Sequence, residues 1–519
     1  MLNLELVQPL PQMLVEHGER FGDKPAFLDD QRSVSYADLE ARTRRIAGHL
    51  ASMGVVRGDP VVIYMDNRVE TAEAYLAATR AGLVGVCINP VAVPAEVSYM
   101  VCDSGARLML TDEGHLEAAQ AAMAGRDETV RVVVAASARA QAGTVLYEEL
   151  ATTEPVASPP DDLGLDEVAW MLYTSGTTGR PKGVKLTQRS CLWVVAACWA
   201  SVAGLSPEDR VLSPLPLFHS YALDLSVLGV FAVGATERIM SRFSTPRVLE
   251  LLAAEPFTVL PGVPTMFQYL VNGVRGETFR DHSLRVCLSA GAIMPSVLNT
   301  EFERAFGVPL LDGYGITETS TMVTMNWPTG TRIMGSCGLP LPGVSVRLVD
   351  PTTGEDVANP DDEGEAWVSG PNVMVGYHNR PEATDEVLRQ GWYRTGDLAR
   401  RDANGYLTIS GRIKELIIRG GENIYPAEIE AVLLEVPDVA DAAVVARPHL
   451  ELGEVPVAFV VPAQPGAMDA SALRDACRRE LAAFKVPEQF IEIDAIPRTG
   501  SGKIMRYRLS ERLASEAAP

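Results

Sequence analysis

The chain has 519 residues, of which 47% are hydrophobic, which is enough for a substantial buried core and more than one domain. Its formal net charge of −22 argues against nucleic acid and anionic membranes as partners. The start of the chain has no basic segment followed by an apolar one, so we expect no signal peptide and a cytoplasmic location. The seven cysteines show no Cys-x-x-Cys spacing, which indicates a reducing compartment and neither disulfides nor a zinc site.

The first four hundred residues alternate short apolar strands with amphipathic helices. Ser35 is a suitable N-cap with Asp38 three residues on, and the apolar face that follows predicts a helix ending at Gly54. This alternation predicts an α/β fold. The elements expected next are a buried strand at residues 61–65, a helix at 70–80 and another strand at 85–88.

Three further segments are distinguished by composition. Residues 118–142 are rich in alanine and residues 154–160 in proline, so we expect both to form a surface connection. Residues 190–207 form an uncharged run of marginal length for a membrane span. Because Gly204 and Pro207 interrupt this run, we expect a buried helix there instead.

Residues 174–183 are the most informative stretch, since they combine hydroxyls, glycines and a lysine after a strand-like run. Glycines let backbone N–H groups turn toward an anion, and Lys182 adds a mobile positive charge. A standard P-loop is excluded, because Arg180 and Pro181 separate the last glycine from Lys182. The stretch predicts a triphosphate-binding loop rather than a solvated linker. Its candidate residues are Thr174, Ser175, Gly176, Thr177, Thr178, Gly179 and Lys182.

After Gly411 the pattern changes to a smaller unit of about a hundred residues that mixes helices and strands. This change predicts a separate α+β domain. Its expected elements are helices at residues 427–435 and 471–483, and strands at 442–446 and 456–461.

Five motifs in chain order resemble those of the adenylate-forming superfamily, which includes acyl-CoA synthetases, amino-acid adenylation domains and firefly luciferase. The matching segments are residues 173–183, 314–319, 393–397, 411–415 and 497–503. The resemblance implies a large multi-subdomain N-terminal domain, residues 1–412, and a small mobile C-terminal lid, residues 413–519. Lys414 lies at the position that matches the hinge of that family.

The same resemblance implies activation of a carboxylic acid by ATP to an acyl-adenylate, with release of pyrophosphate. The acyl group then passes to a pantetheine thiol, either of CoA or of a carrier protein, and the sequence does not decide between the two acceptors. Gly420 and Gly421 match a loop that lines the pantetheine tunnel in thioester-forming members. Luciferase-type oxygenation and a non-enzymatic nucleotide-binding protein are poorer alternatives.

The nucleotide site must hold two anions and a magnesium ion. Glu318 is the candidate ligand of the metal ion, because Mg²⁺ prefers oxygen ligands. Thr317 is the candidate hydrogen-bond donor to the α-phosphate. Tyr314 offers a flat face for adenine. Backbone segments expected to approach the nucleotide contain Asp312, Gly313 and Gly315, and the resemblance adds Gly291 and Ala292.

Asp397 is expected on the ribose hydroxyls, because a carboxylate accepts two hydrogen bonds from a cis-diol, and Arg412 would assist it. The alternative is a local ion pair between Asp397 and Arg394. Lys503 lies in a glycine-rich loop of the small domain, so it acts only when that domain closes over the nucleotide. There it would neutralise charge between the substrate carboxylate and the α-phosphate.

The acyl pocket is expected around residues 219–224, together with residues 262–266 and 289–292. His219 is interpreted as a gating or a packing residue, since no partner supports a role as a base. Asp224 is unusual in an acyl pocket, because burying an unpaired carboxylate there costs free energy. An ammonium group on the substrate would pair with it. Either Asp224 binds an amino group, most plausibly that of a β-amino acid, or it faces away. The other candidate pocket residues are Tyr221, Gly291, Gly315, Met322 and Met325.

Overall fold

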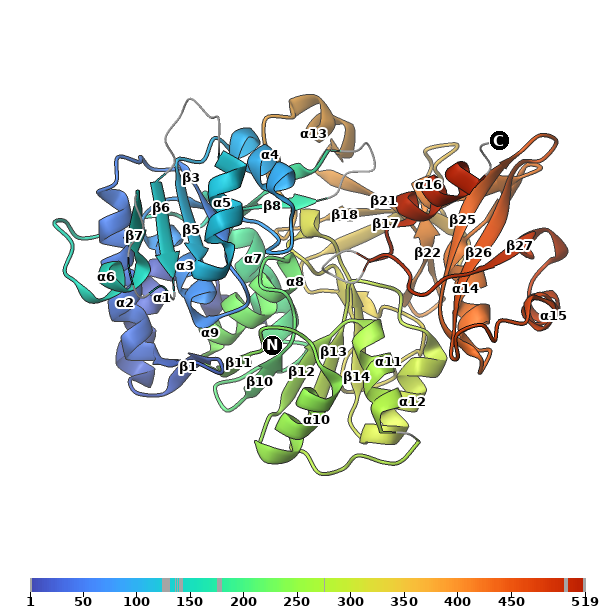
Figure 1. Cartoon of the computed structure of the whole chain (residues 1–519), viewed down its shortest axis with the longest axis horizontal. Coiled ribbons are helices and arrows are strands. Elements are labelled where there is room, and N and C mark those ends of the chain that lie inside the picture. Colours follow the sequence, from blue (N-terminus) through green and yellow to red (C-terminus); the bar gives the residue numbers. More distant parts are fainter. Residues whose placement is uncertain are drawn as a thin grey trace.

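The protein is described here from a computed structural model. The structure describes residues 2–123, 131–135, 137, 139, 143–174, 180–274, 276–498 and 503–516. Two large sheets lie at the left and bottom centre of Figure 1, and the C-terminal domain lies at the right. The architecture is therefore a mixed α/β fold with a large N-terminal domain and a small C-terminal domain.

The first large sheet has nine strands in the order β16-β15-β14-β13-β12-β10-β11-β1-β2. Its strands from β14 to β1 are parallel, and both edges are antiparallel. The strands are β1 (Pro25–Leu28), β2 (Ser33–Ser35), β10 (Arg210–Ser213), β11 (Thr236–Ile239), β12 (Val259–Gly262), β13 (Val286–Ser289), β14 (Leu310–Tyr314), β15 (Thr324–Met325) and β16 (Leu339–Pro340).

The second large sheet has eight strands in the order β19-β9-β8-β4-β3-β5-β6-β7. Only β9 runs antiparallel to its two neighbours, β8 and β19. The strands are β3 (Pro60–Tyr64), β4 (Val84–Cys87), β5 (Leu108–Asp112), β6 (Arg131–Ala135), β7 (Thr144–Leu146), β8 (Val168–Thr174), β9 (Lys182–Thr187) and β19 (Gly376–Tyr377).

One continuous apolar core joins the two sheets through helices that are buried on all sides. These helices are α3 (Val69–Arg80), α7 (Gln188–Val194) with the π-helix η3 (Val195–Ala200), and α8 (Ser220–Ala222) with the π-helix η4 (Leu223–Gly229) and α9 (Val230–Val233). On α3 even the charged side chains are buried, and Glu70, Glu73 and Arg80 form ion pairs.

The other helices of the large domain cover the sheets from outside. They are α1 (Leu10–Phe21), α2 (Tyr36–Ala51), α4 (Pro94–Ser104), α5 (Leu116–Met123), α6 (Tyr147–Thr152), α10 (Thr245–Ala254), α11 (Pro264–Gly273), α12 (Ser296–Phe306) and α13 (Pro381–Val387), with short 3₁₀ turns η1 (Leu4–Leu6), η2 (Glu113–His115) and η5 (Thr317–Thr319).

A third sheet leads into the C-terminal domain, which has its own sheet and two separate apolar clusters. The third sheet contains β17 (Ser345–Val349), β18 (Glu363–Ser369), β20 (Leu388–Arg389), β21 (Trp392–Arg401) and β22 (Leu407–Arg412). After the turn η6 (Ile413–Glu415), the C-terminal domain contains β23 (Ile417–Arg419), β24 (Glu422–Ile424), α14 (Pro426–Leu434), β25 (Val439–His449), β26 (Gly453–Pro462), α15 (Ala470–Glu480), η7 (Ala483–Lys485), β27 (Gln489–Glu492) and α16 (Arg506–Glu516).

The predicted elements agree with the structure in type apart from one segment, but some of their ends differ: the helix expected at residues 471–483, for example, ends at Glu480. The Ser35 side chain accepts a hydrogen bond from the Asp38 backbone as expected, but the helix ends at Ala51, before Gly54. The expectation of a surface connection at residues 118–142 is wrong for part of that segment, because β6 forms there and four of its five residues are buried. Its three consecutive valines pack in the sheet, and so short a run inside an alanine-rich segment shows no periodicity.

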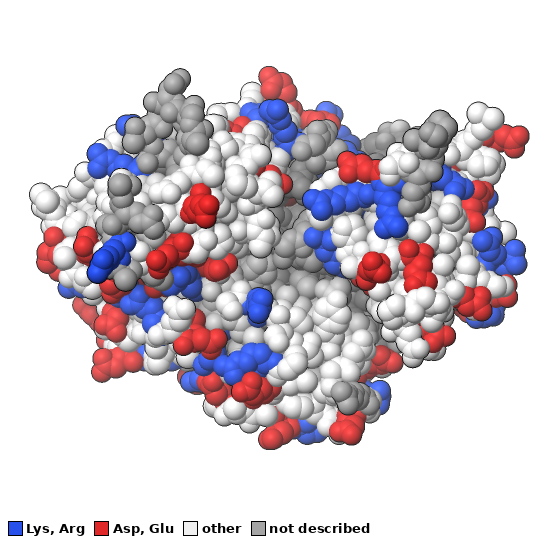
Figure 2. Space-filling view, in the orientation of Figure 1, with Lys and Arg blue, Asp and Glu red and all other residues white. Residues whose placement is uncertain are grey.

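The uncharged run at residues 190–207 begins in a buried helix, as predicted. Among the described residues, no helix is long and apolar enough to cross a membrane. None of the seven cysteines, all of which the structure describes, forms a disulfide, and Cys102 alone among them is exposed. On the face shown in Figure 2, acidic and basic side chains are interspersed, so the net negative charge forms no single acidic patch there.

Candidate active site

The predicted site residues meet at the carboxyl ends of the parallel strands of the first sheet. The chain passes from β10 to β11 on one side and then to β12 on the other side. Ligands of α/β proteins bind at such a switch point, outside the carboxyl ends of the strands. The segments that follow β10, β12, β13 and β14 contain His219, residues 263–266, residues 290–292 and residues 315–318.

Asp397 joins the third sheet to this site. It is 2% exposed. Tyr314 Oη donates a hydrogen bond to its Oδ2 at 2.6 Å, and Arg412 Nε forms an ion pair with its Oδ1 at 2.9 Å. The Asp397 charge is the main cause of a raised Arg412 pKa. The alternative pairing with Arg394 is wrong, since Arg394 pairs with Glu365 at 3.2 Å. Asp397 is therefore held between the two side chains that were predicted to share the nucleotide with it.

The loop that carries Thr317 and Glu318 is strained and tightly packed. Thr321 has φ of +85°, which is unfavourable for a β-branched residue. A Cβ on Gly315 would lie 1.6 Å from the Thr321 carbonyl oxygen, and a Cβ on Gly313 would lie 2.4 Å from Met322 Cε. Both glycines are thus required by the loop's own packing, a reason that differs from the close nucleotide approach expected from the sequence.

Lys503 reaches this site from the C-terminal domain. Burial lowers the pKa of Lys503, as does the nearby Arg412 charge, while Asp397 and Glu318 act in the opposite direction. Burial and the Lys503 charge lower the pKa of His219 to about 3, so His219 is neutral. The charges of Arg412, Asp397 and Glu318 therefore act on one lysine ammonium that the small domain contributes.

Tyr377 is a site residue that the sequence reasoning missed. Its hydroxyl donates to Glu318 Oε1 at 3.0 Å, and Lys182 Nζ lies 5.0 Å from its ring centroid. Lys182 itself pairs with Thr174 across β9 and β8. A strand-forming Gly-Tyr pair is too common to have indicated this role. Ser175, Gly176, Thr177, Thr178 and Gly179 lie outside the described residues.

The acyl-pocket candidates lie on the buried helices behind this site. The Tyr221 ring stacks on Trp199 with 5.8 Å between centroids, and its hydroxyl donates to the Leu288 carbonyl at 3.0 Å. Asp224 is 1% exposed and accepts a hydrogen bond from Trp199 Nε1 at 3.2 Å. The other carboxyl oxygen of Asp224 has no hydrogen-bond partner among the described residues.

Burial raises the pKa of Asp224 well above its usual value. Burial therefore favours the protonated form of the carboxyl group. Trp199 was not predicted, because within an apolar run an indole signals only a buried helix. Met322 and Met325 are fully buried.

The remaining predicted residues lie at turns. Gly291 follows β13 with φ of +90°, and the adjacent Ala292 is exposed. Gly420 and Gly421 form the turn between β23 and β24, with φ of +60° and +91°. Lys414 lies in η6, the short connection between the third sheet and the C-terminal domain.

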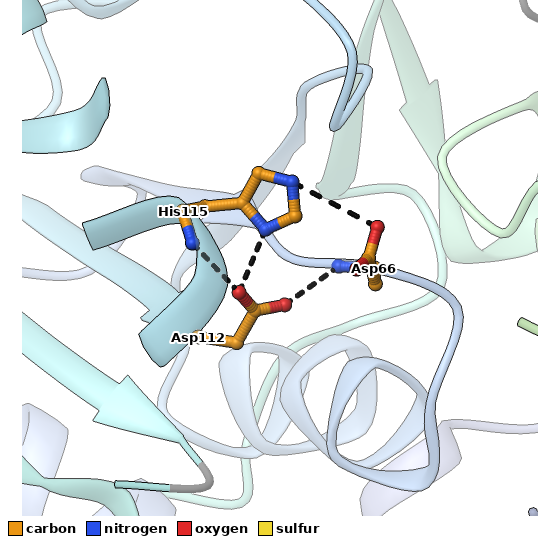
Figure 3. A group of neighbouring side chains, drawn as sticks. All are labelled: Asp66, Asp112 and His115. Atoms are coloured by element: carbon orange, nitrogen blue, oxygen red, sulfur yellow. Dashed lines mark hydrogen bonds and ion pairs between the residues drawn. The ribbon is translucent and has the colours of Figure 1, made fainter. Parts of the chain in front are cut away.

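A second polar cluster, not predicted from the sequence, lies at the carboxyl ends of β3 and β5 (Figure 3). Asp112 Oδ1 accepts hydrogen bonds from the His115 backbone at 3.0 Å and from His115 Nδ1 at 2.7 Å. Asp112 Oδ2 accepts from the Asp66 backbone at 2.8 Å, and His115 Nε2 lies 3.7 Å from Asp66 Oδ1. Because hydrogen bonds within the protein occupy both Asp112 oxygens, we interpret this cluster as structural.

Comparison with known proteins identifies the same two domains. A model of the AMP-binding enzyme family matches residues 14–378, and a model of the AMP-binding enzyme C-terminal domain matches residues 428–503. The solved structure of ATP-bound MatB from Rhodopseudomonas palustris superposes with a TM-score of 0.88 at 31% identity, covering 98% of this chain and 100% of that one.

Two curated relatives are 38% identical to this chain. The feruloyl-CoA synthase of an Amycolatopsis species matches over 92% of this chain and 94% of its own length. The naringenin synthase of Pestalotiopsis fici matches over 96% of this chain, but the chain spans only 19% of the length of that protein.

Proposed function

The chain belongs to the family of AMP-binding enzymes, and on this premise we propose that it activates a carboxylic acid with ATP. The products of the first step are an acyl-adenylate and pyrophosphate. The acyl group then passes to a pantetheine thiol, so the enzyme is an acid–thiol ligase of the AMP-forming kind. The relative named feruloyl-CoA synthase supports CoA as the acceptor.

The position of Lys503 is the observation that carries this proposal. The small domain contributes this one cation to a site where Asp397, Arg412 and Glu318 converge and where His219 is neutral. A cation in that position neutralises the charge that builds up when a carboxylate attacks a phosphate. Preorganised charges of this kind contribute more than any other single factor to many enzymatic rate enhancements.

The other residues bind and orient the nucleotide. Asp397 accepts hydrogen bonds from the ribose hydroxyls, and the Tyr314 ring packs on adenine. Thr317 donates a hydrogen bond to the α-phosphate. Glu318 fits a magnesium ion, because Mg²⁺ is commonly bound by one or two carboxylates together with phosphate oxygens and water. When bound, Mg²⁺ neutralises charge on the triphosphate. Lys182 and the loop before it hold the β- and γ-phosphates until pyrophosphate leaves.

Thioester formation requires the small domain to rotate away from this arrangement. We place the domain boundary between residues 412 and 413 and the hinge at Lys414, which lies in the short connection between the two domains. Rotation would withdraw Lys503 and bring the turn at Gly420 and Gly421 to the pantetheine tunnel. A cytoplasmic location, where CoA is available, is part of this proposal.

Asp224 favours a second candidate function, activation of an amino acid for loading onto a carrier protein. Its unpartnered oxygen is buried behind Tyr221, next to the expected acyl pocket. An ammonium group on the substrate, most plausibly a β-amino group, would ionise Asp224 and supply the missing partner. Simple aromatic and fatty acids offer no such partner.

ATP–pyrophosphate exchange measured over a panel of aromatic, fatty, α-amino and β-amino acids tests the proposal. Exchange that requires one class of acid would support adenylation and would identify the substrate class. Absence of exchange with every acid, under conditions where a known ligase is active, would refute it. The second candidate requires a preference for an amino acid that Asp224→Asn removes, while activity with the des-amino analogue is retained.

A further inference from the structure

Tyr377 contacts both charged residues that the proposed function assigns to the metal–triphosphate. We propose that Tyr377 is a positioning residue that keeps Glu318 and Lys182 apart in the free enzyme and directs each toward its ligand. This inference rests on the proposed function, because it assumes that a magnesium–ATP complex binds between the two side chains.

The hydroxyl group of Tyr377 determines where the Glu318 carboxylate lies. It donates to Glu318 Oε1 at 3.0 Å, and Tyr377 is 8% exposed, so its ring has little freedom to turn. Burial and the Glu318 charge raise the pKa of Tyr377, so the phenol remains a protonated donor at neutral pH.

The ring of Tyr377 determines where Lys182 lies. Lys182 Nζ is 5.0 Å from the ring centroid, within the range of a cation–π contact. Strand pairing fixes this contact, because β19 pairs with β9 and places Tyr377 opposite Val184. The next residue, His378, also donates its backbone N–H to the Gly183 carbonyl at 2.7 Å.

The segment around Tyr377 also holds the other side of the site. The Met374 backbone donates to the Glu318 carbonyl at 2.9 Å. Asn372, which is fully buried, donates to the carbonyls of Thr319 and Met322 at 3.3 and 2.8 Å. Residues 372–378 therefore attach the Glu318 loop and the strand that begins at Lys182 to one short segment, with the Tyr377 phenol between their charged ends.

This arrangement keeps both charges available. Within the described part of the chain, no ion pair joins Lys182 to Glu318; Lys182 contacts the Tyr377 ring, and the Glu318 charge acts on Lys503 of the small domain. A direct ion pair between Lys182 and Glu318 would neutralise the two charges that bind the triphosphate and the metal ion. Binding of Mg·ATP would then have to break that ion pair first. A neutral phenol offers each charge a weaker partner that a phosphate or a metal ion displaces more easily.

The test is calorimetric titration of ATP with and without magnesium, using Tyr377→Phe and Tyr377→Leu. Tyr377→Phe keeps the ring but loses the donor to Glu318. We expect its affinity for Mg·ATP to fall about tenfold, as for a lost hydrogen bond to a charged group, while metal-free ATP binds as in the wild type. Tyr377→Leu also loses the ring, so it should weaken the binding of both forms.

Tyr36→Phe is the control, because Tyr36 is also buried and its hydroxyl donates to the Ala235 carbonyl at 2.7 Å, in the core of the large domain. This variant should lose stability but bind both forms of ATP normally. Equal weakening of both forms by Tyr377→Phe, or no weakening, would overturn the inference. Wild-type protein that binds neither form would refute the proposed function, and this inference with it.

Discussion

Replacing Asp224 by asparagine should change how the stability of the protein depends on pH. Asp224 is buried, receives one hydrogen bond from Trp199, and has an oxygen without a described partner. Burial raises its pKa in the folded state, whereas in the unfolded chain it ionises near pH 4. As pH rises above that value, only the unfolded state loses the proton, so the free energy of unfolding falls.

The size of this effect follows from proton linkage. One proton bound only by the folded state reduces the free energy of unfolding by about 1.4 kcal/mol per pH unit, until the pH reaches the folded pKa. Between pH 5 and 7 the wild type should therefore lose about 2.7 kcal/mol relative to Asp224→Asn, if it keeps the proton throughout. An asparagine imitates the protonated acid but does not titrate, so any constant cost of the amide leaves this slope unchanged.

Urea denaturation of both proteins at pH 5, 6 and 7 measures the slope. Asp209→Asn is the matched control. Burial opposes ionisation of Asp209 as well, but Arg285 and Thr258 outweigh it and lower the Asp209 pKa. That group is ionised in both states across this range, so its variant should be destabilised by the same amount at every pH. A constant difference for Asp224→Asn as well would show that Asp224 is ionised in the folded protein and would refute the reasoning.

Three further predictions concern the hinge, the ribose site and the second cluster. Lys414→Pro, which restricts φ at the proposed hinge, should spare ATP–pyrophosphate exchange but slow thioester formation about a hundredfold, and an unimpaired overall rate would remove the hinge assignment. Asp397→Asn should weaken ATP about tenfold to a hundredfold in a binding titration, because it removes a charged partner of Arg412 at 2.9 Å, and unchanged affinity would contradict the ribose role. A hydrogen bond to Asp112 raises the pKa of His115, so the stabilisation by His115 is complete below pH 6.5 and is lost as pH rises through its folded pKa. Denaturation curves should show His115→Gln less stable by about 1 kcal/mol at pH 6 and closer to the wild type at pH 8.5; a deficit that grows with pH would show the opposite linkage.

Motifs in which several residue types recur at a required spacing predicted which residues the fold would bring near one another, while their chemical roles stay predictions. Lys503, Asp397 and Glu318 lie far apart in the chain, yet the structure brings their charges together. The alternation of strands and helices could also be predicted from the sequence, since a buried strand such as β3 is a continuous apolar run. In these cases local chemistry and the fold impose the same requirement.

The failures have a different physical origin, because they depend on contacts made in three dimensions. Tyr377 contacts the Glu318 loop and the strand that begins at Lys182, and no pattern around it in the sequence indicates a hydroxyl donor to Glu318. Gly315 was recognised as necessary, but the Thr321 carbonyl that makes it necessary lies on a strained turn that sequence does not reveal. The strand β6 was missed because its valines are too few to show a period.

The most direct test of the account is a separate measurement of the two half-reactions in Lys503→Ala. The charges of Arg412, Asp397 and Glu318 act on Lys503 in this structure, and the proposed rotation of the small domain would withdraw the lysine from them, so we expect it to matter for adenylation alone. We predict that acyl-adenylate formation, measured by pyrophosphate exchange, falls at least about a hundredfold, as when one preorganised stabilising group is removed. Thioester formation from supplied acyl-adenylate should stay close to the wild-type rate. Equal loss of both half-reactions would contradict the account, because Lys503 would then support the structure rather than the first chemical step.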